Sequence, residues 1–141
     1  MKKPKIIIVD DNQSFLKSLI LLINIENIAS VTGRANNGKE FIELLSENKP
    51  DLVLMDIDMP FMDGIESTQK ALELIPDLKI IIFSMFGNEE YYTKMIELGV
   101  KGYLLKSCNI EDLEEAIREV MNGNTYFYHE SLIKKFKDII S

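Results

Sequence analysis

Five short apolar runs alternate along the chain with segments of helical period, and this alternation restricts the fold more than any other feature of the sequence. The runs are of strand length and mostly rich in β-branched residues. Strands that alternate with helices of this length imply right-handed crossovers and a parallel sheet covered on both faces. The sequence therefore predicts a doubly wound α/β domain. The predicted strands are 5–10, 29–35, 51–56, 79–84 and 101–106.

The 141 residues suit one domain followed by a tail. We expect the domain over 1–124, and a linker or tail over 125–141 that carries one additional helix at 130–140. Gly123 would close the last helix of the domain, because glycine favours the position after a helix end. The five helices predicted to flank the sheet are 11–26, 39–48, 64–75, 88–98 and 110–122.

Charge and composition argue against several classes of function. The net charge of −7 argues against nucleic-acid binding by this part of the protein, because phosphate contacts need a basic surface. The one cysteine, Cys108, excludes an internal disulfide and a cysteine-cluster metal site, and it fits a reducing compartment. The longest apolar stretch, 15–25, is broken by Lys17 and is too short to cross a membrane. With no secretory leader visible, we expect a cytoplasmic protein.

Charged and hydroxyl side chains follow four of the predicted strands at the point where each strand ends. In a doubly wound sheet these ends converge on one edge, which is where ligands bind. A lone carboxylate at a strand end is usually a helix cap or a turn residue, whereas a set with complementary charges on one edge favours a shared site. The set comprises Asp10, Asp11, Asp56, Asp58, Ser84 and Lys106.

These residue types suit phosphoryl transfer. Carboxylates that repel one another favour a hard divalent cation such as Mg²⁺. A carboxylate can also act as the nucleophile and form an aspartyl phosphate. A lysine and a hydroxyl can then stabilise the negative charge on the transferred group. The sequence therefore predicts a phosphoryl-transfer site at this edge of the sheet.

Four motifs carry a resemblance to a known family. They are IIIVDDN, DLVLMDIDMPFMDGIE, IIIFSM and GVKGYLLKS, and the similarity runs from about residue 5 to about residue 123. The chain resembles the receiver domain of bacterial two-component response regulators. The stretch 84–107 resembles the NarL/LuxR-like subfamily, which carries a C-terminal helix-turn-helix domain. The resemblance implies a flavodoxin-like sheet of five parallel strands in the order 2-1-3-4-5, the order known for chemotaxis receivers.

The resemblance also implies roles for the residues at the strand ends. Asp56 matches the phosphoacceptor, and Tyr103 matches an aromatic residue that forms a conformational switch together with Ser84. The implied ligands of Mg²⁺ are Asp10, Asp11, Asp56 and Asp58, the last through its backbone carbonyl, and the residues implied to bind the phosphoryl group are Ser84 and Lys106.

Partners follow from the same resemblance. It implies a sensor histidine kinase that phosphorylates the domain, a homodimer formed on phosphorylation, and DNA binding only through a C-terminal domain that lies outside this chain. Such a domain is not an enzyme, apart from Mg²⁺-dependent self-phosphorylation and self-dephosphorylation. Two candidate dimer surfaces are the wide apolar face of the first helix, with Leu16, Ile20 and Ile23, and the tail helix.

Three alternatives differ in output or in chemistry. The chain could be a stand-alone receiver without DNA-binding output, or a pseudo-receiver that binds partners without phosphorylation. The Asp-x-Asp of 56–58 also occurs in haloacid-dehalogenase-like phosphatases, which use an aspartyl phosphate too. In those phosphatases the second acidic pair follows the lysine, whereas here Asp10 and Asp11 precede the nucleophile. Chain order therefore disfavours the phosphatase.

Overall fold

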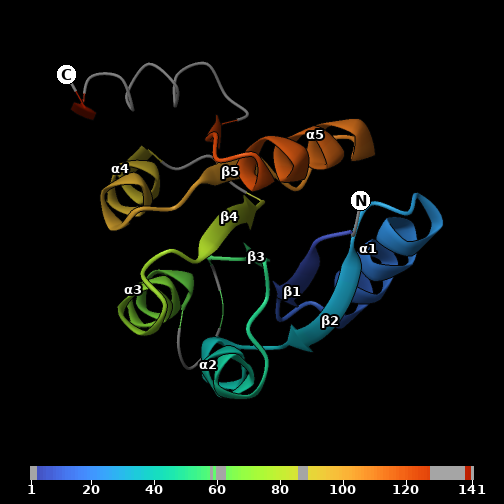
Figure 1. Ribbon diagram of the computed structural model, residues 1–141, viewed down its shortest axis with the longest axis horizontal. Helices are drawn as coiled ribbons and strands as arrows, with labels where there is room; N and C mark the ends of the chain where they lie inside the picture. The colour runs from blue at the N-terminus through green and yellow to red at the C-terminus, as the bar shows by residue number, and fades with distance from the viewer. Residues whose placement is uncertain (1–2, 58, 60–62, 86–88, 128–138, 141) are drawn as a thin grey trace.

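The computed structural model describes residues 3–57, 59, 63–85, 89–127 and 139–140, and within them strands and helices alternate as predicted (Figure 1). The helix expected at 130–140 lies outside the described residues except for 139–140, which are helical. The elements are β1 (Lys5–Val9), α1 (Gln13–Ile25), β2 (Ser30–Ala35), α2 (Gly38–Glu47), β3 (Leu52–Met55), α3 (Gly64–Leu74), β4 (Lys79–Ser84), α4 (Glu89–Leu98), β5 (Gly102–Leu105), α5 (Ile110–Met121) and β6 (Tyr126–Phe127).

The sheet is parallel and has the order β2-β1-β3-β4-β5-β6, which confirms the predicted order of the first five strands. The sixth strand was not predicted, and it falls in the segment expected to be a linker. Two residues are too few for hydrophobic periodicity to reveal a strand. Pairing places Tyr126 opposite Gly102, and a Cβ at Gly102 would lie 3.0 Å from the Tyr126 carbonyl oxygen. The absence of a side chain at 102 therefore lets β6 lie against β5.

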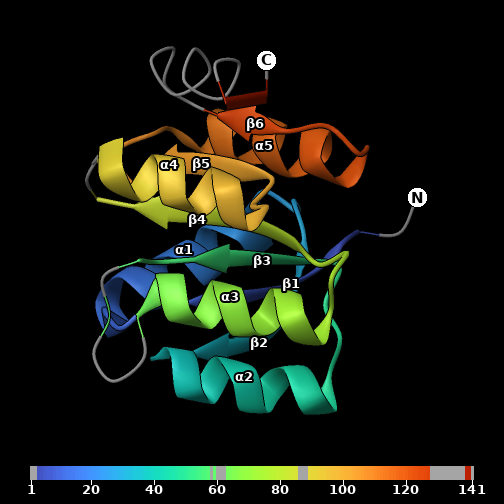
Figure 2. The ribbon, with the colours of Figure 1, turned by 90° about the vertical axis from the view of Figure 1, so that its left-hand side faces the viewer.

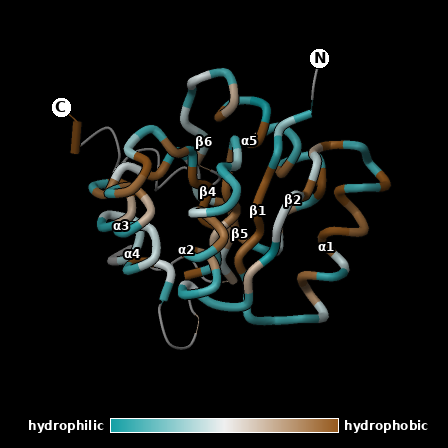
Figure 3. Tube along the Cα trace, turned by 60° about the horizontal axis from the view of Figure 1, so that its bottom comes forward, coloured by the Kyte–Doolittle hydropathy of each residue, from teal (hydrophilic) through white to brown (hydrophobic). Residues whose placement is uncertain are grey.

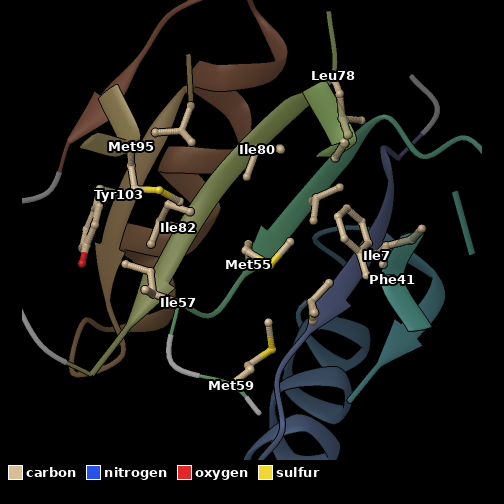
Figure 4. Close-up of a cluster of buried hydrophobic side chains, with 14 of the residues drawn as sticks. Ile7, Phe41, Met55, Ile57, Met59, Leu78, Ile80, Ile82, Met95 and Tyr103 are labelled. Carbon is tan, nitrogen blue, oxygen red and sulfur yellow. The ribbon is translucent and has the colours of Figure 1, made fainter. Parts of the chain in front are cut away.

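Helices cover both faces of the sheet, as the alternation predicts. Figure 2 shows α2, α3 and α4 on one face, with α1 behind the sheet. Residues of α2, α3 and α4 pack in one buried cluster with alternate residues of the strands, including Phe41, Met95 and Tyr103 (Figure 4). The other cluster joins α1 and α5, with Leu16 and Ile117 among its members. The central strands are buried on both faces, which explains why their sequences are continuously apolar.

The apolar face of α1 is oriented differently from the expectation. Leu16 and Ile23 are fully buried, and Ile20 packs partly buried against the same cluster, so these residues do not form a free dimer surface. Hydrophilic and hydrophobic stretches alternate along α1 in Figure 3, and the buried residues Leu16, Leu19 and Ile23 recur at the three- to four-residue spacing of a helix face turned to the core. The apolar residues of α1 that the structure leaves exposed are Leu21, Leu22 and Ile25.

Side-chain caps determine where several helices begin. Asn109 caps α5, since its side chain accepts a hydrogen bond from the backbone N–H of Asp112. Gly123 follows α5 with φ +92°, a conformation that suits glycine. Among the described residues, none of the helices has both the length and the apolar character needed to span a membrane.

Candidate functional site

The predicted residues meet at the carboxyl edge of the sheet. The N–H of Asp56 donates to the Val9 carbonyl over 3.0 Å, which places Asp56 beside the end of β1 and next to Asp10. The N–H of Lys106 donates to the Ser84 carbonyl over 2.7 Å, which joins the ends of β4 and β5. Because β3 lies between β1 and β4, Asp56 has Asp10 on one side and Ser84 on the other. The sheet therefore assembles the site from four strand ends.

Three carboxylates form an acidic cluster at this edge. One oxygen each from Asp10, Asp11 and Asp56 lies within 4.8 Å of the others. Asp10 and Asp56 are buried, with 2% and 6% of their surface exposed, whereas Asp11 is exposed. The N–H of Asn12 donates to Asp10 Oδ1 over 2.9 Å and holds that side chain in place. Such a group of hard oxygen donors, open to solvent on one side, could hold a divalent cation.

Asp58, the fourth predicted member of the metal site, lies outside the described residues.

Lys106 provides the positive charge of the site. Its Nζ lies 2.5 Å from Asp10 Oδ2 and 3.6 Å from Asp56 Oδ2, and only 8% of the side chain is exposed. The ammonium also lies over the ring of Phe15, 4.4 Å from the ring centroid. Since two buried carboxylates repel each other, one shared cation offsets part of that repulsion. The same cation could stabilise negative charge added to Asp56.

Ser84 and Tyr103 connect the site to the core. Tyr103 is 1% exposed, and its ring meets the edge of Tyr92 with centroids 4.1 Å apart. Burial raises the pKa of the Tyr103 hydroxyl, while a hydrogen bond with the Ser84 side chain acts in the opposite direction. Figure 4 shows the Tyr103 ring beside Met95 at the margin of the apolar cluster. Tyr103 therefore links the Ser84 side chain at the end of β4 to the buried packing between β5 and α4.

Gly64 allows α3 to begin close behind the acidic site. Its N–H donates to the Ile57 carbonyl over 2.8 Å. A Cβ at this position would lie 2.4 Å from the Asp56 carbonyl oxygen and 2.6 Å from Ile57 Cα. Both contacts are with backbone, so only glycine fits without a shift of one segment.

The interpretation of the sequence missed one neighbour of the site, Phe15. Phe15 lies in the first turn of α1, which begins shortly after Asp11. Apolar residues at helical spacing indicated a core position, and nothing in the pattern indicated contact with Lys106, which lies far along the chain.

Comparison with known proteins identifies the family. The family model for the response regulator receiver domain matches residues 6–118. The chain belongs to this family. It is 37% identical over 125 residues to the transcriptional regulatory protein DesR of Bacillus subtilis, a match that covers 89% of this chain and 62% of DesR. It is 38% identical over 123 residues to the oxygen regulatory protein NreC of Staphylococcus aureus, covering 86% of this chain and 57% of NreC.

Solved structures agree with this assignment. A LuxR-family two-component response regulator from Aurantimonas superposes with a TM-score of 0.87 at 26% identity, covering 97% of both chains. A LuxR-family DNA-binding response regulator from Staphylococcus aureus gives a TM-score of 0.79 at 29% identity, covering 84% of this chain and 99% of that one. The receiver domain described here is thus of the LuxR-family type, and the comparisons offer no support for a phosphatase.

The chain spans about three fifths of the length of the curated relatives it matches. Receiver domains of response regulators are signalling proteins and not typical enzymes.

Proposed function

We propose that this receiver domain accepts a phosphoryl group on Asp56 from a sensor histidine kinase. The observation that carries the proposal is the position of Lys106 Nζ, which lies within 4 Å of both Asp10 and Asp56 at the end of the sheet. Asp56 is the carboxylate at the end of the central strand β3, with acidic neighbours on one side and a hydroxyl on the other. A nucleophile placed between a metal-binding group and positive charge suits transfer of an anionic group.

Lys106 and Ser84 would each contact a different oxygen of the phosphoryl group on Asp56. Lys106 would turn from Asp10 toward an oxygen of the bound phosphoryl group, because the added negative charge competes for the ammonium. Ser84 would donate its hydroxyl to a second oxygen. The hydroxyl and the cation come from the ends of β4 and β5, which lie on the other side of β3 from the strand that precedes the acidic pair.

The acidic cluster fits Mg²⁺, which prefers carboxylate oxygens and retains several waters. Asp10, Asp11 and Asp56 would hold it, and the family resemblance adds the backbone carbonyl of Asp58. The bound ion would neutralise negative charge shared by the carboxylates and the incoming phosphate. Asp11 is the exposed member and would meet the ion first.

We further propose that phosphorylation acts through Ser84 and Tyr103. A phosphoryl group that draws the Ser84 hydroxyl would alter the hydrogen bond to Tyr103 and so favour one packing of the surface between α4 and β5. The phosphorylated form would be a homodimer. Self-phosphorylation from a small donor and self-dephosphorylation would be its only chemistry.

Relatives support an output in transcription. DegU of Brevibacillus brevis and DesR are named as transcriptional regulatory proteins, and the Staphylococcus aureus neighbour is named as DNA-binding. We propose that residues 1–124 form the receiver unit, that 125–141 lead to a C-terminal DNA-binding domain, and that the protein acts in the cytoplasm. The acidic receiver would contact DNA only through that further domain.

Intact-mass spectrometry tests the phosphoacceptor. With Mg²⁺ and acetyl phosphate, the wild type should gain one phosphoryl group, and Asp56→Asn should gain none. Asp77→Asn is the matched control, because Asp77 has 85% of its side chain exposed in a loop away from the site. It should be modified like the wild type. Equal modification of the wild type and Asp56→Asn would refute the assignment.

A further inference from the structure

Phe15 contacts the cation of the site without belonging to the acidic cluster. Its ring centroid lies 4.4 Å from Lys106 Nζ, within the range in which an aromatic face attracts an ammonium. We propose that Phe15 is a positioning residue, which keeps the Lys106 ammonium close to Asp56, from where it can turn to an added phosphoryl group; this role rests on the phosphoryl transfer proposed above. The ring would set the direction of the lysine and would not touch the phosphoryl group.

The local sequence places the ring with little freedom. Asn12 caps α1, and its side chain accepts a hydrogen bond from the Phe15 N–H over 3.0 Å, so Phe15 lies in the first turn directly after the acidic pair. The ring also packs on Phe83, with centroids 5.8 Å apart. Phe83 is 6% exposed and precedes Ser84 at the end of β4. Phe15 therefore lies between the start of α1 and the carboxyl end of β4, in contact with the Lys106 ammonium.

The residues around Lys106 show which groups lie beside its ammonium on the side of the Phe15 ring. A pocket of about 150 Å³ lies between α1 and the start of α5, and Phe15 and Lys106 both line it. Its other lining residues are uncharged, and Ser18 and Asn109 are the polar ones among them. Among the described residues that line this pocket none carries a negative charge, and the face of the Phe15 ring adds negative potential beside the ammonium, which Asp10 and Asp56 also attract.

Packing alone is the simpler explanation for a half-buried phenylalanine, and it makes a different prediction. If Phe15 only fills space, an apolar side chain of similar size should preserve the lysine geometry. If the ring face attracts the ammonium, an apolar replacement without a ring removes that attraction and lets Lys106 move into the pocket, away from Asp56. A lysine with several conformations would stabilise the transferred group less well, because catalysis depends on charges held in advance.

Phe15→Leu and Phe15→Tyr separate these explanations in the whole chain, since tyrosine keeps the ring. The first measurement is the NMR shift of the Lys106 ε-methylene protons, which an aromatic face moves upfield. We expect this upfield shift in the wild type and in Phe15→Tyr, and its loss in Phe15→Leu. The measurement needs no phosphodonor, and it reports the contact itself.

The second measurement is the initial rate of Asp56 phosphorylation by acetyl phosphate with Mg²⁺. Phe15→Leu should slow it by about two- to thirtyfold, the range that the strength of a cation–π contact implies, and Phe15→Tyr should stay within about twofold of the wild type. Phe41→Leu is the matched control, because this buried ring lies in the other cluster and should not change the rate. In a Lys106→Met background, Phe15→Leu should have no further effect.

Equal losses in Phe15→Leu and Phe15→Tyr would overturn the positioning role in favour of packing. A wild-type rate in Phe15→Leu would overturn it as well, and so would a full effect of Phe15→Leu in the Lys106→Met background. Failure of the proposed function is recognised separately, because in that case the wild type itself would remain unphosphorylated.

Discussion

A methyl group at position 64 should push the first turn of α3 away from the backbone that follows Asp56. The Cβ of Gly64→Ala would lie 2.4 Å from the Asp56 carbonyl oxygen, whereas ordinary contacts begin at 3.4 Å. The contacted atoms are backbone, so no side chain can rotate to make room. The helix start, the Asp56 loop or both must move by about 1 Å to restore a normal van der Waals distance.

Two effects of opposite sign contribute to stability. Overpacking of this kind typically costs about 1–3 kcal/mol. Alanine in a helix gains up to about 1 kcal/mol over glycine, and less near the first position. The net expectation is therefore a loss of about 1–2 kcal/mol in the free energy of unfolding. Because the shift displaces the backbone of the phosphoacceptor itself, the phosphorylation rate should fall more steeply, by up to about 10²-fold for a misplacement of about 1 Å.

Urea denaturation measures the first effect, and phosphorylation by acetyl phosphate measures the second. Gly33→Ala is the control, because a Cβ there would meet only side chains, the nearest being Ile7 Cγ1 at 3.4 Å. It should change the free energy of unfolding by less than about 0.5 kcal/mol and leave the rate unchanged. The steric argument fails if Gly64→Ala matches the wild type in both measurements.

Two further predictions concern groups outside the site. Thr68 Oγ1 is buried and has no hydrogen-bond partner among the described residues, so Thr68→Val should raise the free energy of unfolding by about 1 kcal/mol. Ser67→Ala, which removes a hydrogen bond of 2.6 Å to the Asp63 carbonyl, should lower it, and a loss of stability in both variants would contradict this. Burial, with a smaller contribution from Asp112, raises the pKa of Cys108 to about 11, so iodoacetamide at pH 8 should alkylate it about 100-fold more slowly than in the urea-unfolded chain, with the rate rising about tenfold per pH unit. Equal alkylation rates in the folded and unfolded chain would contradict the raised pKa of Cys108.

The sequence alone predicted the architecture and the members of the acidic site. Strands buried on both faces must be apolar throughout, and their alternation with helical segments leaves few topologies other than the doubly wound sheet. Since parallel strands of such a sheet end on one edge, the sequence predicts that side chains such as Asp56 and Lys106 lie close together. These inferences depend on local periodicity and on chain direction, which a sequence records directly.

The tertiary structure decided contacts that depend on how the elements pack. The face of α1 with Leu16 and Ile23, expected as a dimer surface, is buried against the sheet, and the apolar residues left exposed include Leu21 and Ile25. Periodicity could not place Phe15 against Lys106, which follows β5, or reveal β6, whose Tyr126 pairs with Gly102 of β5. Such contacts join residues distant in the chain through distances of a few ångströms, and those distances are determined by the packed core as a whole.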